Sequence, residues 1–107
     1  MQKRIETITA VLDKHKAEAI EVFDLKAKDY FVDTVIIASS LGTRHTEALL
    51  DHLKREIKPS EEFLGTDISD EWIVIDLGDI LIHIMTPEYR VKYDMETFLS
   101  TLEKEES

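Results

Sequence analysis

WIVIDLGDILIHIM, residues 72–85, is the segment from which the architecture of this 107-residue chain follows. Two runs rich in β-branched and aliphatic residues flank Gly78 and Asp79, and such runs are typical of β-strands. A glycine in the first position of a two-residue loop supplies the positive φ that a type II′ turn requires. The segment therefore predicts an antiparallel hairpin in which Leu77 faces Ile80 and Trp72 faces Met85.

Alternation along the two strands sorts their side chains onto two sides of the hairpin. One side is wholly aliphatic and is expected to be buried beneath helices: Ile73, Ile75, Leu77, Ile80, Ile82 and Ile84. The other, which we call the mixed side, carries Trp72, Val74, Asp76, Leu81, His83 and Met85. Its composition is closer to the centre of a protein interface than to a packed core. The mixed side is therefore a candidate partner-binding surface.

Residue patterns outside the hairpin predict further helices and strands. Apolar residues at helical spacing predict one helix over residues 2–16 and a second that starts after Gly42 and ends before Pro59, because proline disfavours helix in the residue before it. Runs rich in β-branched residues predict strands at residues 20–25 and 34–39. Residues 61–66 predict a weaker strand at the edge of the sheet.

A third helix is expected to begin at Thr86, where Thr86 suits the N-cap, Pro87 the first helical position and Glu88 the positive end of the helix dipole. Its buried stripe is expected to comprise Val91, Met95, Phe98, Leu99 and Leu102. At about 100° per residue, Tyr89 and Tyr93 fall near the opposite side. The two tyrosines are therefore expected to be exposed and join the candidate partner-binding residues.

Three helices alternating with about five short strands predict an α/β fold, in which helices cover a mixed sheet mainly on one face. A chain of this length holds one core, so residues 1–107 are expected to form a single domain. Residues 1–18 would be its N-terminal helical segment, and the polar residues 103–107 a frayed tail.

The chain contains no cysteine, which excludes disulfides, thiolate zinc sites, iron–sulfur clusters and cysteine nucleophiles. Its apolar runs are shorter than the roughly 18 residues of a membrane span. Charges are spread through the first 16 residues, unlike the apolar core of a secretory signal. A cytoplasmic protein with no membrane partner is therefore expected.

Acidic residues outnumber basic ones by 23 to 13, giving a formal net charge of −10. All of the excess lies after residue 58, where thirteen acidic residues face three basic ones. Such a charge repels a phosphate backbone, so direct nucleic-acid binding is not expected. The same charge favours a basic protein partner through electrostatic steering.

Motifs of catalysis are absent from the sequence. It has no G-x-S-x-G elbow and no phosphate-binding loop of the G-x-x-x-x-G-K type. Asp76, Asp79 and His83 are residue types that bind metals, but Asp79 lies in the turn and His83 opposite Val74, so the three are not expected to converge. His45 and His52 are interpreted as surface histidines. We therefore expect no catalytic residue, no metal site and no cofactor.

Three blocks of residues carry a resemblance to a known family. Residues 24–45 contain Asp24, Lys28, Asp33, Arg44 and His45, and residues 71–85 contain Trp72, Asp76, Gly78, Asp79 and His83. Arg90, Tyr93, Met95, Glu96 and Phe98 follow. In these positions the chain resembles the ribosomal silencing factor, or Iojap, family.

The resemblance implies a nucleotidyltransferase-like fold without established catalysis. It also implies a non-enzymatic factor that binds ribosomal protein fourteen of the large subunit, blocks association of the two subunits and represses translation under nutrient limitation. The residues expected to bind this partner are Trp72, Val74, Asp76, Leu81, His83, Met85, Tyr89 and Tyr93.

Two other hypotheses remain open from the sequence. The fold implied by the resemblance, together with Asp76, Asp79 and His83, is compatible with a metal-dependent, nucleotidyltransferase-like domain that binds nucleotides. Alternatively, the mixed side joins two copies of the chain, because exposed apolar patches also mediate self-association.

Overall fold

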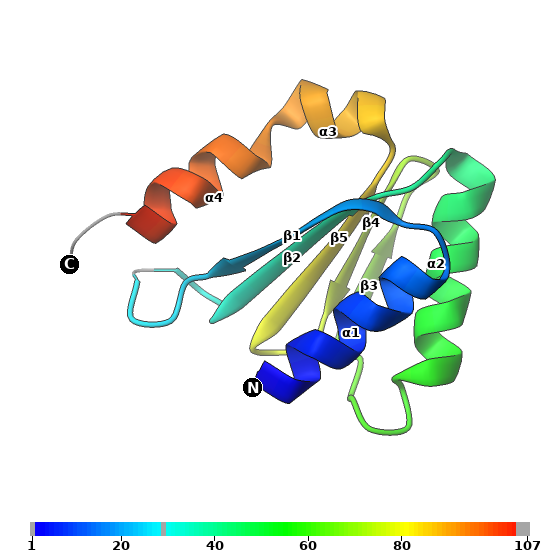
Figure 1. Ribbon diagram of the computed structural model, residues 1–107, viewed down its shortest axis with the longest axis horizontal. Coiled ribbons are helices and arrows are strands. Elements are labelled where there is room, and N and C mark those ends of the chain that lie inside the picture. The colour runs from blue at the N-terminus through cyan, green and yellow to red at the C-terminus, as the bar shows by residue number, and fades with distance from the viewer. Residues whose placement is uncertain (1, 29, 105–107) are drawn as a thin grey trace.

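Five strands form one mixed sheet in the order β1-β2-β5-β4-β3 (Figure 1). The structure is a computed structural model that describes residues 2–28 and 30–104. The strands are β1 (Glu18–Asp24), β2 (Thr34–Ser39), β3 (Gly65–Ile68), β4 (Trp72–Asp76) and β5 (Ile80–Met85). The helices are α1 (Gln2–Lys14), α2 (Thr43–Glu56), α3 (Pro87–Tyr93) and α4 (Met95–Lys104). The predicted α/β fold class is confirmed.

The β4–β5 hairpin has the register that the sequence predicts. Trp72 pairs with Met85 and Asp76 with Leu81, and the Leu77 N–H donates to the Ile80 carbonyl at 2.9 Å. Gly78 adopts a φ of +96°, the left-handed backbone that the turn requires. On its other edge β5 runs parallel to β2, which makes it the central strand, and every one of its residues is buried.

Helices α1 and α2 cover one face of the sheet (Figure 1). Ile8 and Leu12 from α1 and Leu49 and Leu53 from α2 pack there against the aliphatic side of the hairpin. All six residues of that side are buried, as predicted. Each helix places apolar residues at three- and four-residue spacing on the face toward the sheet, so this layer follows from the sequence pattern.

Helices α3 and α4 cover part of the other face, and the break between them corrects the predicted third helix. Asp94 has a left-handed backbone with φ 39°, which ends α3 and changes the direction of the chain. The helical phase therefore restarts, and Val91 and Phe98, predicted in the buried stripe, are 80% and 58% exposed. Leu99 is buried in the position that the prediction gives it.

The edge strand lies later in the chain than predicted. The sequence predicts it at residues 61–66, whereas β3 spans Gly65–Ile68. Its position is set by antiparallel pairing with β4, in which Gly65 faces Asp76 and Ile68 faces Ile73. Phe63, before the strand, packs instead against the core beneath α1 and α2.

Two further expectations concern the predicted frayed tail and the absence of a membrane-spanning helix. Glu103 and Lys104 belong to the last turn of α4, while residues 105–107 of the predicted tail lie outside the described residues. Within residues 2–28 and 30–104, the helices are too short or too polar to span a bilayer.

Arg90 is a buried cation that connects α3 to the rest of the fold. One guanidinium nitrogen donates to the Ala19 carbonyl at 2.6 Å and to the Ser39 hydroxyl at 2.9 Å. The other two donate to the carboxylates of Glu96 and Glu21 at 2.8 and 3.1 Å. The bonds to β1 hold an irregular part of that strand, where the register with β2 shifts between Glu18 and Glu21 and Ala19 has a positive φ of 47°.

Replacing Arg90 should destabilise the protein. Arg90→Met leaves the buried Ser39 hydroxyl and the Ala19 carbonyl without this donor, so we expect a loss of about 2–3 kcal/mol in the free energy of unfolding. The exposed Arg44→Met on α2 is the matched control and should change it by less than about 0.5 kcal/mol. Urea denaturation of both variants measures the difference, and equal midpoints would contradict this role for Arg90.

Gly78 in the hairpin turn provides a second stability test, because Gly42 can serve as a control glycine with neither a positive φ nor a close neighbour. Gly78→Ala forces a side chain into positive φ with its Cβ 3.1 Å from Leu64 Cδ1, and should cost at least about 1 kcal/mol. At Gly42 a Cβ meets nothing within 4 Å and φ is 165°, so Gly42→Ala should be nearly neutral. Thermal unfolding compares the two, and a Gly78→Ala protein as stable as wild type would contradict the turn's strain.

Candidate functional site

Three aromatic side chains line up on the sheet face that α3 partly covers. The ring centroid of Trp72 lies 5.0 Å from that of Tyr93, and the centroid of Tyr93 lies 5.5 Å from that of Tyr89. Trp72 and Tyr89 are half-buried and Tyr93 is 47% exposed. We call these three side chains the aromatic row. It presents apolar ring surface to solvent from one strand and one helix.

The start of α3 places both tyrosines. Tyr89 and Tyr93 are one helical turn apart and therefore share a face of the helix. Pro87 occupies the first turn as predicted, and the extended Thr86 precedes it. The Thr86 hydroxyl makes no capping hydrogen bond, which corrects the predicted side-chain cap, and the helix starts instead with the Arg90 N–H donating to the Thr86 carbonyl at 2.9 Å.

The buried His83 side chain holds Trp72 of the aromatic row by a hydrogen bond. The Trp72 indole N–H donates to His83 Nδ1 at 3.0 Å, so the imidazole proton lies on Nε2. Burial lowers the pKa of His83 to about 4, which keeps the ring neutral near pH 7. This bond was not predicted, although Trp72 and His83 are diagonal neighbours on one face of the predicted hairpin.

The predicted mixed side is only partly open. Leu81, His83 and Met85 are 7%, 4% and 1% exposed, because α3 and α4 fold back over this face of the sheet, where Leu81 and Met85 join Leu99 in one buried cluster. Five of the eight predicted partner-binding residues keep accessible surface: Trp72, Val74, Asp76, Tyr89 and Tyr93. We call these five the aromatic–acidic face. The other three lie beneath it.

An acidic hollow over β3 and β4 adjoins the aromatic row. It has a volume of about 330 Å³ and is lined by Gly65, Thr66, Asp67, Val74, Asp76 and Leu81. Asp67 lies opposite Val74 in the strand pairing and is exposed. Asp67 was not among the predicted partner-binding residues, because β3 was predicted too early in the chain. Its carboxylate adds a negative charge beside the aromatic row.

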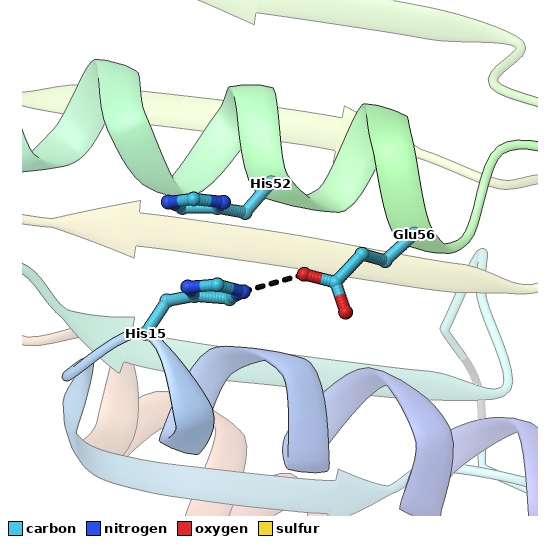
Figure 2. Close-up of side chains that lie close together, drawn as sticks. All are labelled: His15, His52 and Glu56. Atoms are coloured by element: carbon cyan, nitrogen blue, oxygen red, sulfur yellow. Dashed lines mark hydrogen bonds and ion pairs between the residues drawn. The ribbon is translucent and has the colours of Figure 1, made fainter.

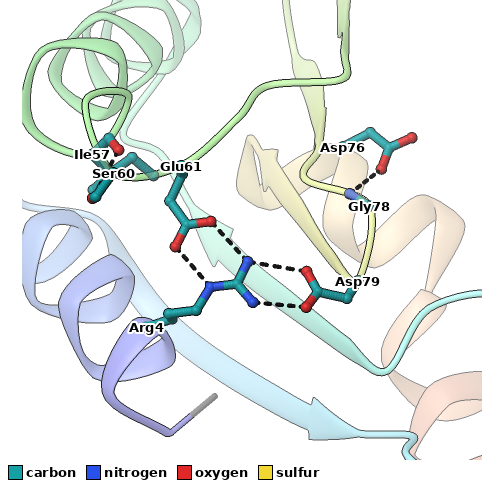
Figure 3. Close-up of polar contacts among 7 residues, drawn as sticks. All are labelled: Arg4, Ile57, Ser60, Glu61, Asp76, Gly78 and Asp79. Atoms are coloured by element: carbon teal, nitrogen blue, oxygen red, sulfur yellow. Dashed lines mark hydrogen bonds and ion pairs between the residues drawn. The ribbon is translucent and has the colours of Figure 1, made fainter.

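The turn carboxylates are engaged in structural contacts (Figure 3). Asp79 accepts two hydrogen bonds from Arg4, at 2.7 and 3.0 Å, and Glu61 accepts two others from the same guanidinium. The bonds from Arg4 lower the pKa of Asp79. Asp76 accepts from the Gly78 N–H at 2.8 Å. Asp76, Asp79 and His83 therefore do not share a ligand position, and the metal-dependent alternative gains no support from them.

The group of side chains that is close enough to hold a metal ion, among the residues described, lies elsewhere. It consists of His15, His52 and Glu56, between α1 and α2 (Figure 2). His52 was interpreted as a surface histidine, whereas it is half-buried and stacks on His15. The four-residue spacing of His52 and Glu56 is visible in the sequence, but the approach of His15 depends on how α1 packs.

This chain is similar to known proteins in both structure and sequence. A solved structure from Chromobacterium violaceum superposes with a TM-score of 0.85 at 24% sequence identity, covering 92% of this chain and 85% of that chain. A mouse protein named mitochondrial assembly of ribosomal large subunit protein 1 is 30% identical over 99 residues. That match covers 86% of this chain and 43% of the longer mouse protein.

Two further matches concern a single family. A Haemophilus influenzae protein named ribosomal silencing factor RsfS is 33% identical over 95 residues, which cover 86% of this chain and 93% of that protein. The family model described as ribosomal silencing factor during starvation matches residues 1–107. The resemblance inferred from the hairpin and its flanking blocks is thereby confirmed, and the chain belongs to the ribosomal silencing factor family.

Proposed function

We propose that this protein binds ribosomal protein fourteen of the large ribosomal subunit through the aromatic–acidic face, prevents the small subunit from joining, and so represses translation when nutrients are limiting. The observation that carries the proposal is the aromatic row, open to solvent and bordered by carboxylates. Membership of a family named for silencing ribosomes during starvation supports it, as does the similarity to a mouse protein named for assembly of the large subunit.

The chemistry of the aromatic–acidic face favours a basic protein as partner. Tyrosine and tryptophan are common anchors of protein interfaces, because they bury a large apolar area and keep a polar group that hydrogen-bonds at the rim. Asp67 and Asp76 beside them, together with the net charge of −10, attract a basic surface and repel exposed RNA phosphates. The partner is therefore a ribosomal protein rather than ribosomal RNA.

The size of the domain is sufficient for a steric block. A standard protein interface takes roughly 800 Å² from each partner, about an eighth of the 6240 Å² surface of the described residues. The molecule extends 39 by 32 by 22 Å. A domain docked by one face therefore stands at least its shortest dimension above the surface of the large subunit. This mechanism needs no chemical step, in keeping with a family named as silencing factors and not as enzymes.

Truncation of the aromatic row should weaken ribosome binding. Tyr93→Ala removes the most exposed ring of the row, and we expect a loss of roughly 2 kcal/mol, or about 30-fold in affinity for isolated large subunits. Cosedimentation with large subunits through a sucrose gradient measures it. Phe98→Ala is the matched control, because Phe98 is also exposed but lies on α4, and its binding should equal that of wild type.

Two outcomes would contradict the proposal. One is a folded wild-type protein that stays at the top of the gradient, and the other is equal binding of the Tyr93→Ala and Phe98→Ala variants. Sedimentation velocity of the free protein tests the homodimer alternative. If Tyr93→Ala converts a dimer into a monomer, the same face serves self-association.

A further inference from the structure

We propose that His15, His52 and Glu56 form a binding site for a divalent transition metal of the zinc class, which would connect α1 to α2. The site lies on the sheet face opposite the aromatic–acidic face and is independent of the proposed ribosome binding. Each of the three residues offers one ligand atom, and these atoms lie within 4.8 Å of one another.

The two helices bring the ligands together in a simple way. His52 and Glu56 are four residues apart on α2, so their side chains project from the same face one turn apart. His15 follows the last residue of α1, and its N–H still donates to the Val11 carbonyl. Figure 2 shows the two imidazoles one above the other with the Glu56 carboxylate beside them.

The three ligand atoms must shift to reach the spacing of an occupied metal site. Zinc bonds of about 2.0–2.2 Å in tetrahedral geometry place neighbouring ligand atoms about 3.3–3.6 Å apart. In the structure His15 Nε2 lies 2.5 Å from a Glu56 oxygen, and the two imidazole centroids are 3.5 Å apart with 5° between their planes. Binding requires the parallel rings to turn so that their lone pairs converge, a change in side-chain torsions and not in the backbone.

The His52 ring is half-buried and stacks on the His15 ring. Among residues 2–28 and 30–104, no residue hydrogen-bonds the His52 ring, so its nitrogens are available to a ligand.

A fourth residue holds the His15 segment in place. The His45 ring nitrogen Nδ1 accepts from the Leu41 N–H at 2.8 Å, so His45 Nε2 carries the proton and donates to the His15 carbonyl at 2.8 Å. The first turn of α2 thereby fixes the backbone of the residue that faces His52. Such outer contacts orient the ligands of metal sites.

The donor set selects the class of metal. Two imidazole nitrogens and one carboxylate oxygen suit Zn²⁺ and its neighbours Co²⁺, Ni²⁺ and Cu²⁺, whereas Mg²⁺ and Ca²⁺ prefer oxygen ligands throughout. Three protein ligands leave one tetrahedral position for water. Because the ligands meet only when α1 is packed on α2, bound metal would stabilise the folded state.

Isothermal titration of the untagged 107-residue protein with ZnCl₂ tests the site. We expect one Zn²⁺ per chain for wild type and no heat with MgCl₂. His52→Asn and Glu56→Gln should each lower Zn²⁺ affinity by about tenfold or more. Asp51→Asn, which removes an exposed carboxylate next to His52, is the matched control and should stay within about twofold of wild type. Zn²⁺ should raise the unfolding temperature of wild type and of the control only.

The proposal is overturned if wild type takes up no Zn²⁺, or if all four proteins bind it equally, which would place the ion elsewhere. Circular dichroism first establishes that the variants fold. Should a variant fail this check, the absorption spectrum of wild type with CoCl₂ decides the matter. Intense visible bands of tetrahedral Co²⁺ support the site, and a spectrum identical to that of aqueous Co²⁺ excludes it.

Discussion

The position of β5 between β2 and β4 is the constraint on which the rest of the structure depends. β5 pairs in parallel with β2 and antiparallel with β4, and its residues are buried on both faces. A slip of one residue in either pairing would move Ile80, Ile82 and Ile84 to the opposite face of the sheet. The α1–α2 layer and the aromatic row therefore both depend on the turn at Gly78.

The parts of the fold that follow from local rules were predictable from the sequence. The two-residue turn sets the hairpin register without help from the rest of the chain, and helical periodicity identifies α1 and α2. The placement of β3 was wrong because pairing with β4 decides it, not the composition of residues 61–66. The break at Asp94 was missed because a non-glycine residue with φ 39° leaves no strong sequence signal.

In the candidate site, too, the features set by local sequence rules were predictable and those set by tertiary packing were not. Trp72, Val74 and Asp76 were predicted on one side from strand alternation, and the structure places them there with the tyrosines of α3. Alternation gives the side of a sheet but not what covers it, so the burial of Leu81 and Met85 in the cluster that includes Leu99 could not be predicted from it. The approach of His15 to His52 was equally unpredictable, because it depends on how two helices pack.

The two outer strands of the sheet have a consequence for behaviour at high concentration. An open strand edge is a template on which other chains add by backbone hydrogen bonding. Here β1 is interrupted near Ala19, where its register shifts, and β3 has four residues with a carboxylate at Asp67. Irregular or short, charged edges of this kind resist strand addition. The domain is thus suited to remain dispersed when many copies accumulate.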